Sequence, residues 1–277
     1  MSVATTNAID AVFAELKAKG ETAIIPFLTM GDPDLETSVS LVQAAEAAGA
    51  HMIELGVPYS DPLADGPVIQ RASERALRHS VSLADCMSVA AKARERGVGM
   101  PFILFTYFNP VLQFGLDRFF EQLKANDFSG VIIPDLPLEE DEETRQKAEA
   151  AGIHLIPLVA PTSDARVERI AARARGFVYC VSSLGVTGVR SEFYSGIDKF
   201  LATVRGAANV PICVGFGISS REQVEQLSSS CDGVIVGSAI VRKVEEALPL
   251  LTATEAGKRR EGLEAVQAFI AGLKPRS

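Results

Sequence analysis

Short apolar runs alternate with amphipathic segments along nearly the whole chain. Eight runs are almost continuously hydrophobic and end at Gly, Pro, Ser, Thr or Asp, which is typical of strands buried on both faces of a parallel sheet. Between them, Leu35–Ala48 and Glu139–Ala151 show helical spacing and are followed by Gly49 and Gly152, residues that commonly end helices. The predicted strands are residues 22–29, 51–55, 101–107, 130–135, 153–161, 177–182, 211–217 and 232–238.

Eight strands with intervening helices in about 250 residues favour an α/β fold of the (β/α)8, or TIM-barrel, type. An open doubly wound sheet is the alternative. No linker-like or low-complexity stretch interrupts the chain, so we expect residues 1–277 to form a single TIM-barrel domain. Residues 1–20 predict an extra N-terminal helix, and residues 254–277 a C-terminal amphipathic helix that covers the barrel.

Composition excludes several classes of protein. The chain has 27 basic and 35 acidic residues and a formal net charge of -8, which argues against binding nucleic acid through a basic face. Its four cysteines form no CxxC pair, as expected for a reducing cytosol. The N-terminus lacks the apolar region of a signal peptide, and no run reaches the roughly 18 apolar residues that cross a bilayer. We therefore expect a cytoplasmic protein.

The stretch "ELGVPYSDPLADGP", residues 54–67, crowds three acids at the end of a predicted strand and the long loop after it. Period-two alternation puts Glu54 on the same strand face as Met52. We place this face at the barrel mouth, where partial burial raises a carboxyl pKa and favours general acid/base catalysis. A structural role for Glu54, and turn-forming roles for Asp61 and Asp65, are the alternatives.

Glycines close the last two predicted strands and suggest a phosphate site. Gly215, Gly217, Gly237 and Ser238 precede helical segments, whose N-terminal N–H groups bind phosphate in many barrels. Tight packing of strand against helix is the alternative reason for glycine here. In residues 185–188, the glycines of "GVTG" predict a loop that closes over the ligand.

Missing residue types narrow the reaction. All nine lysines lie outside the predicted strands, so a Schiff base or a bound pyridoxal phosphate is not expected. His51, His79 and His154 form no metal-ligand cluster, and we interpret each as structural or surface-exposed. The sequence thus predicts acid/base chemistry without a metal or cofactor, on a substrate that supplies its own electron sink.

Together, "PFLTMGDP", "ELGVPYSDPLADGPVIQ", "GVTG", "VGFGIS" and "GSAIV" resemble the α subunit of tryptophan synthase, from Ile25 to Val241. The resemblance implies a lyase that cleaves indole-3-glycerol phosphate to indole and glyceraldehyde 3-phosphate in L-tryptophan biosynthesis. It makes Glu54 the acid/base that protonates the ring carbon, Asp65 the acceptor of the ring N–H, and Tyr179 an active-site support.

The same resemblance implies binding residues and a partner. The phosphate would rest on Gly188, Gly217, Gly237 and Ser238. The indole ring would lie among Phe27, Tyr107, Phe216 and Ile235, with Thr187 contacting Asp65. Pro58, Asp61 and Pro137 would meet a β subunit that carries pyridoxal phosphate, in an α2β2 heterotetramer.

Two positions depart from the common family pattern: Ser183 replaces a frequent arginine and Tyr59 a frequent phenylalanine. Three other functions stay open at this point. They are a relative that releases indole without a partner, a catalytically silent barrel that only activates another protein, and a different phosphate-binding barrel such as a sugar-phosphate isomerase.

Overall fold

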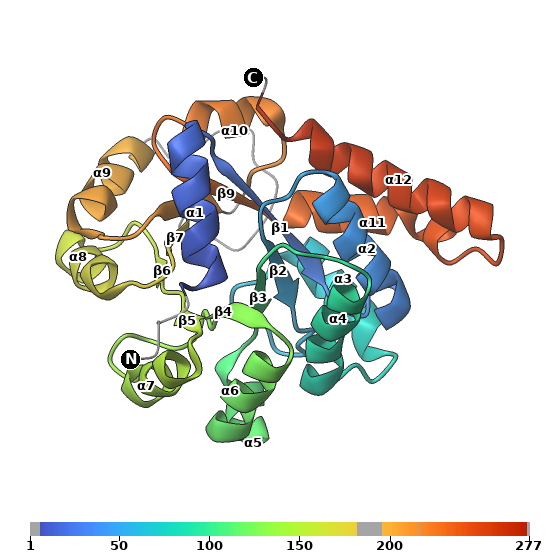
Figure 1. Ribbon diagram of the computed structural model, residues 1–277, viewed down its shortest axis with the longest axis horizontal. Coiled ribbons are helices and arrows are strands. Elements are labelled where there is room, and N and C mark those ends of the chain that lie inside the picture. The colour runs from blue at the N-terminus through green and yellow to red at the C-terminus, as the bar shows by residue number, and fades with distance from the viewer. Residues whose placement is uncertain (1–5, 182–195, 216, 276–277) are drawn as a thin grey trace.

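The computed structural model describes residues 6–181, 196–215 and 217–275 (Figure 1). Its strands pair only in parallel and form one sheet in the order β5-β4-β3-β2-β1-β9-β8-β7-β6. The strands are β1 Ala23–Thr29, β2 Ile53–Gly56, β3 Phe102–Phe105, β4 Phe128–Ile132, β5 His154–Leu155, β6 Leu158–Val159, β7 Val178–Val181, β8 Ile212–Gly215 and β9 Gly233–Val236.

The two ends of this sheet meet at Ile156–Pro157. The Ile156 N–H donates to the Val131 carbonyl at 2.9 Å, while the Pro157 carbonyl accepts from the Tyr179 N–H at 3.0 Å. One residue thus pairs with β4 and the next with β7, which closes the barrel and excludes the open sheet. The prediction of a single strand over residues 153–161 was wrong, because Pro157 has no N–H and the chain changes partner at that point.

The helices follow the strands as predicted. Asp34 caps α2 by accepting the Thr37 N–H at 2.7 Å, and Gly152 ends α7 in the left-handed conformation with φ 77°. The helices are α1 Ala8–Lys19, α2 Leu35–Ala47, α3 Pro67–Leu77, α4 Leu83–Glu95, α5 Phe108–Phe114, α6 Leu116–Ala125, α7 Glu142–Ala151, α8 Asp164–Arg173, α9 Ile197–Ala207, α10 Arg221–Leu227, α11 Ser238–Leu251 and α12 Ala256–Gly272.

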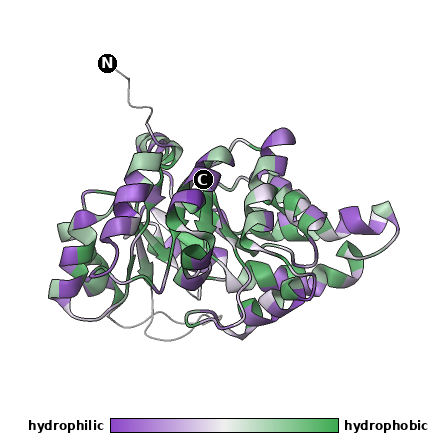
Figure 2. Ribbon diagram, turned by 90° about the horizontal axis from the view of Figure 1, so that it is seen from below, coloured by the Kyte–Doolittle hydropathy of each residue, from purple (hydrophilic) through white to green (hydrophobic). Residues whose placement is uncertain are grey.

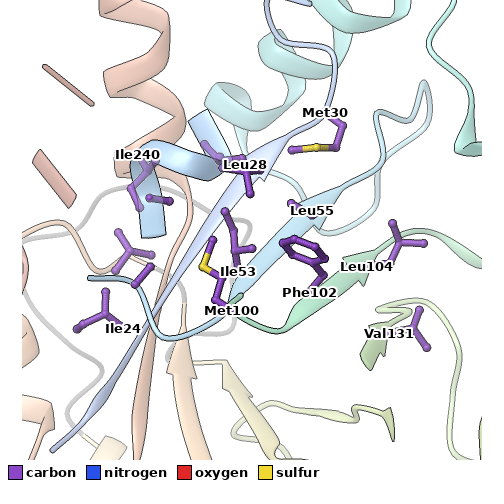
Figure 3. Packing of buried hydrophobic residues seen from close by; sticks show 14 of the residues in the cluster. Ile24, Leu28, Met30, Ile53, Leu55, Met100, Phe102, Leu104, Val131 and Ile240 are labelled. Carbon is purple, nitrogen blue, oxygen red and sulfur yellow. The ribbon is translucent and has the colours of Figure 1, made fainter. Parts of the chain in front are cut away.

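Two hydrophobic layers result from strand alternation. Leu28, Ile53 and Leu55 point outward and pack under the helices, as Figure 3 shows. Phe27 and Met52 belong to a second cluster inside the barrel. In Figure 2, apolar segments gather towards the centre of the molecule and polar ones lie towards its outside. The inward face of each strand is therefore known, and this decides which strand-end side chains reach the barrel mouth.

Both predicted terminal helices are present. α1 lies across the strands (Figure 1), and its Ile9, Phe13 and Leu16 join the interior cluster. The Asn7 side-chain amide ties its start to the barrel by donating to the Ser129 carbonyl at 2.9 Å. α12 packs against α11 and α2. Within the described residues, no helix is both long and apolar enough to cross a membrane.

Candidate active site

Glu54 lies inside the barrel, on the face that alternation from Met52 predicts. It sits in the middle of β2, opposite Phe27 of β1 in the sheet register, and is only 1% exposed. No cationic side chain of the described chain pairs with it, and its Oε1 has no hydrogen-bond partner there. Burial raises the pKa of Glu54 well above its ordinary value. Burial therefore favours the neutral, proton-bearing form of this carboxyl, the form that can donate.

Asp65 reaches the same space from the loop before α3. It is 7% exposed, and its Oδ2 accepts a hydrogen bond from the Tyr107 hydroxyl at 3.1 Å. Burial raises the pKa of Asp65 to about 6, and the bond from Tyr107 opposes this rise. A pKa of about 6 leaves Asp65 mostly ionised at pH 7, whereas complete burial favours the neutral form of Glu54. Two acids held in different protonation states by their surroundings are typical of an acid/base pair.

Tyr179 stands beside Glu54 on the inner face of β7. Burial and the nearby charge of Glu54 raise the pKa of its hydroxyl well above the ordinary value, so the hydroxyl keeps its proton. A Cβ at Gly215 would come within 2.3 Å of this hydroxyl. Gly215 therefore serves close packing, the alternative considered for the glycines of this turn, and makes room for Tyr179.

Gly217 and Gly237 differ from Gly215. Gly217 has φ +87°, which L side chains rarely adopt. A Cβ at Gly237 would make only ordinary contacts, 3.7 Å from the Phe27 Cβ. Gly237 and Ser238 stand at the first turn of α11, where backbone N–H groups point out of the helix and favour an anion.

These groups line one small cavity. It is lined by Phe27, Glu54, Asp65, Ile69, Phe105, Tyr179, Gly217, Ile235, Gly237 and Ser238. Eight of these ten were named as site residues from the sequence, and they come from six separate segments of the barrel. Acid groups, an aromatic and aliphatic wall and a helix N-terminus thus share one space.

Sequence reasoning missed two lining residues and part of the role of a third. Phe105 shares the inner face of β3 with Ile103 and lies two residues before Tyr107, so alternation along the predicted strand 101–107 could have found it. Ile69 reaches the cavity from α3, and no strand-end rule could have found it. Tyr107 is not among the lining residues; its hydroxyl holds Asp65 and also accepts the Ala64 N–H at 3.0 Å.

Three predicted site residues, Thr187, Gly188 and Phe216, lie outside the described residues, as does Ser183. Tyr59 is described, and its ring stacks on Tyr107 with centroids 4.8 Å apart. Tyr59 therefore packs on the residue whose hydroxyl donates to Asp65.

The predicted partner residues differ in exposure. Asp61 is exposed, Pro137 half-buried and Pro58 buried. A larger cleft of about 680 Å³ runs past Pro137 and Leu63 between α7 and α8. This cleft contains neither Glu54 nor the α11 N-terminus, so the smaller cavity is the better candidate for the chemistry.

The histidines have structural contacts. His51 Nδ1 accepts the Ile24 N–H at 3.0 Å, and His154 Nε2 lies 2.9 Å from Asp10 Oδ2. Over the part of the chain that the structure describes, no group of three or more His, Cys, Asp or Glu could hold a metal ion.

Comparison with known proteins agrees with this geometry. A sequence model of the tryptophan synthase alpha chain family matches residues 13–274. The chain is 49% identical to the tryptophan synthase alpha chain of Bacillus licheniformis, over 91% of this chain and 94% of the relative. The Geobacillus kaustophilus alpha chain is 53% identical over 82% and 85%, respectively.

Solved structures agree as well. A tryptophan synthase subunit alpha from Legionella pneumophila superposes with TM-score 0.86 at 34% identity, covering 97% of both chains. A tryptophan synthase structure from Mycobacterium tuberculosis gives TM-score 0.84 at 35% identity, covering 96% of both. With its barrel, its buried acids and its family match, the chain belongs to the tryptophan synthase alpha chain family.

Proposed function

We propose that this protein cleaves indole-3-glycerol phosphate to indole and glyceraldehyde 3-phosphate, as the α subunit of a tryptophan synthase. The observation that carries the proposal is one cavity in which Glu54, Asp65 and the N-terminus of α11 meet. The substrate has a matching arrangement of groups: a ring N–H, a ring carbon that must be protonated and a terminal phosphate.

Glu54 begins the reaction as an acid. Because burial favours its protonated form, it can donate its proton to the ring carbon that bears the side chain. The resulting carboxylate then takes the proton from the adjacent side-chain hydroxyl as the C–C bond breaks. The bond electrons return to the indole ring, and the hydroxyl becomes the aldehyde. Glu54 ends as it began, and no proton is gained or lost overall.

Asp65 supports the intermediate. Protonation of the ring carbon leaves a cationic indolenine, whose N–H gains positive character. An ionised Asp65 accepts that N–H and stabilises the cation, and the Tyr107 hydroxyl fixes the position of the carboxylate. The indole ring itself acts as the electron sink, so the chemistry requires no metal or cofactor in this subunit.

The remaining groups bind and orient. Ser238, Gly237 and Gly217 receive the phosphate, and Gly188 is proposed to join them. Phe27 and Ile235 flank the indole, while Thr187 and Phe216 are proposed to complete the contacts. The Phe27 and Phe105 rings meet edge to face at 5.5 Å, which stiffens this apolar wall.

We further propose a β subunit as partner, in an α2β2 complex whose pyridoxal phosphate belongs to β. Leu63 supports this proposal, since it is 76% exposed next to Pro137 and Asp61 at the carboxyl end of the barrel. A partner docked at this end of the barrel would remove the leucine side chain from water, which favours association. A cytoplasmic location and a single domain over residues 1–277 are part of the same proposal.

Indole release from indole-3-glycerol phosphate tests the activity directly. We expect turnover by the isolated chain and faster turnover after a tryptophan synthase β subunit is added. Equal rates with and without β would contradict the partnered function and favour a relative that releases free indole. No indole in either condition would favour a silent barrel.

Ligand-induced thermal stabilisation distinguishes the proposed function from the remaining alternative, a sugar-phosphate isomerase. Indole-3-propanol phosphate, which carries both ends of the substrate, should raise the melting temperature because it binds only the folded chain. Stabilisation by sugar phosphates but not by this analogue would instead indicate an isomerase of sugar phosphates.

A further inference from the structure

A chain of ion pairs connects three segments behind the cavity. Arg75 of α3 donates from Nε and Nη2 to both oxygens of Asp32, at 2.8 and 2.9 Å. Its Nη1 donates to Glu245 of α11 at 2.7 Å. The Asp32 side chain is 2% exposed and that of Arg75 20%, so water screens this pair far less than a surface pair.

The connected segments are those that carry the two ends of the site. Asp32 follows β1, in the loop just beyond Thr29. α3 carries Asp65 immediately before its first turn, and the Gln70 side-chain amide donates to the Asp65 carbonyl at 2.8 Å. α11 carries Gly237 and Ser238 at its N-terminus. Arg75 is thus bonded to both neighbours of the helix that holds Asp65.

Side-chain contacts transmit this connection to the cavity. Ile69 of α3 lines the cavity, and its Cδ1 lies 3.9 Å from the position that a Cβ would take at Gly237. A shift of α3 along α11 would therefore move Asp65 and Ile69 relative to the phosphate seat at Gly237 and Ser238.

We propose that Arg75 is a positioning residue, which sets the separation between Asp65 and the phosphate seat by bonding α3 to Asp32 and to α11. The inference rests on the proposed function, because it assigns the two ends of the site to the two ends of one substrate. Arginine suits this role because its planar fork can bind one carboxylate with two donors and a second carboxylate with a third. A lysine has a single charged nitrogen and cannot hold both in that geometry.

The test uses a ligand that spans both ends and fragments that occupy one end each. Indole-3-propanol phosphate joins an indole and a phosphate through a short chain, so its affinity depends on their separation. The affinity of indole alone, or of inorganic phosphate alone, does not depend on that separation. Dissociation constants for all three are measured by calorimetry or competition on the full chain.

Two variants change the connection in different ways. Arg75→Lys keeps the charge and loses the fork. The double variant Asp32→Asn with Arg75→Gln removes both charges together, so no buried charge is left without a partner. Arg205→Gln is the matched control, because it breaks an Arg–Asp pair, Arg205 to Asp232, near the amino end of β9.

In both Arg75 variants, affinity for indole-3-propanol phosphate should fall about tenfold, while indole and inorganic phosphate bind within about twofold of the unmodified chain. Arg205→Gln should leave all three unchanged. Unchanged binding of the spanning ligand, or equal weakening of all three, would overturn the positioning role. If the unmodified chain neither binds the analogue nor releases indole, the proposed function itself fails.

Discussion

Asp32 and Glu54 are buried acids near the carboxyl ends of adjacent strands, yet their surroundings are opposite. Asp32 is bonded through both oxygens to Arg75, whereas Glu54 has no cationic partner in the described chain and leaves Oε1 without a hydrogen bond. Burial raises the pKa of both, but the bonds from Arg75 act against the rise at Asp32 only. The paired acid holds the framework together. The unpaired acid, Glu54, keeps a raised pKa, which is typical of catalytic acids and bases.

The largest expected effect is on the unpaired acid. Glu54→Gln should lower kcat for indole release by about a thousandfold or more, because it removes the proton donor and acceptor. Stability should not fall, since glutamine closely matches the neutral form of the buried acid. Steady-state assays and thermal unfolding measure the two effects. A variant with full activity would end the assignment of Glu54 as the catalytic acid/base.

Asp65 is the intermediate case, with a neutral donor and a pKa of about 6. Its folded pKa lies above the ordinary 3.8, so its stabilising contribution is complete below pH 3.8 and disappears as pH rises through about 6. Relative to Asp65→Asn, the unmodified chain should therefore lose about 3 kcal/mol of unfolding free energy across that range.

Activity should show the opposite trend with pH. Because the proposed role needs ionised Asp65, kcat/KM should fall below pH 6, about tenfold per pH unit at the acid extreme. Denaturant titrations and rate profiles from pH 4 to 8 test both trends. A pH-independent stability difference between Asp65→Asn and the unmodified chain would show that this carboxyl is not perturbed.

Asp32, the paired acid, should matter more for stability than for catalysis. Asp32→Asn leaves the partly buried Arg75 with Glu245 alone, and we expect unfolding free energy to drop by about 2 kcal/mol. Asp32 does not line the cavity, so the fall in kcat should be far smaller than for Glu54→Gln. Urea unfolding and steady-state kinetics supply the comparison. If Asp32→Asn lowers kcat as much as Glu54→Gln, the distinction between framework and catalytic acids fails.

Gly237 and Gly215 should likewise separate an effect on substrate binding from an effect on stability. A methyl at Gly237 meets only ordinary contacts, so Gly237→Ala should fold normally while raising KM about tenfold, since the methyl intrudes where phosphate is proposed to bind. Gly215→Ala would press against the Tyr179 hydroxyl and should instead destabilise the fold by about 1–3 kcal/mol. Kinetics and thermal unfolding of the two variants side by side separate the effects.

The smallest expected effect comes from removing the Tyr107 hydroxyl, the neutral donor to Asp65. Tyr107→Phe removes the bond that lowers the pKa of Asp65, so the acid limb of the rate profile should move upward by less than about one pH unit. Tyr59→Phe is the control, because it keeps the ring that stacks on Tyr107 and does not touch Asp65. An acid limb that stays in place in Tyr107→Phe would mean that the profile reports another group.

Strand-end logic predicted much of the site because parallel strands bring their carboxyl ends together whatever their sequence separation. Alternation grouped Glu54 with Met52, and the poor fit of a carboxylate under apolar helices favoured the barrel mouth for that face. Glycines before a predicted helix start pointed to Gly237. Contacts that depend on how a helix docks could not be predicted this way. Ile69 and Arg75 are ordinary helical residues until α3 packs against α11.

The division of the strand at Pro157 was also missed. A continuous apolar run favours one strand, and nothing local shows that its first half pairs with β4 and its second with β7. Proline was the available signal, since it removes one ladder donor.

The position of α1 bears on where the product goes. Ile9, Phe13 and Leu16 fill the barrel interior from the amino ends of the strands, behind the cavity. Indole formed beside Glu54 would thus leave through the opposite end, past the loop that carries Leu63. Indole is uncharged and diffuses readily through lipid, so an exit facing a bound partner would decide whether the cell retains it. In that case α1 would direct the release of indole towards the carboxyl end of the barrel.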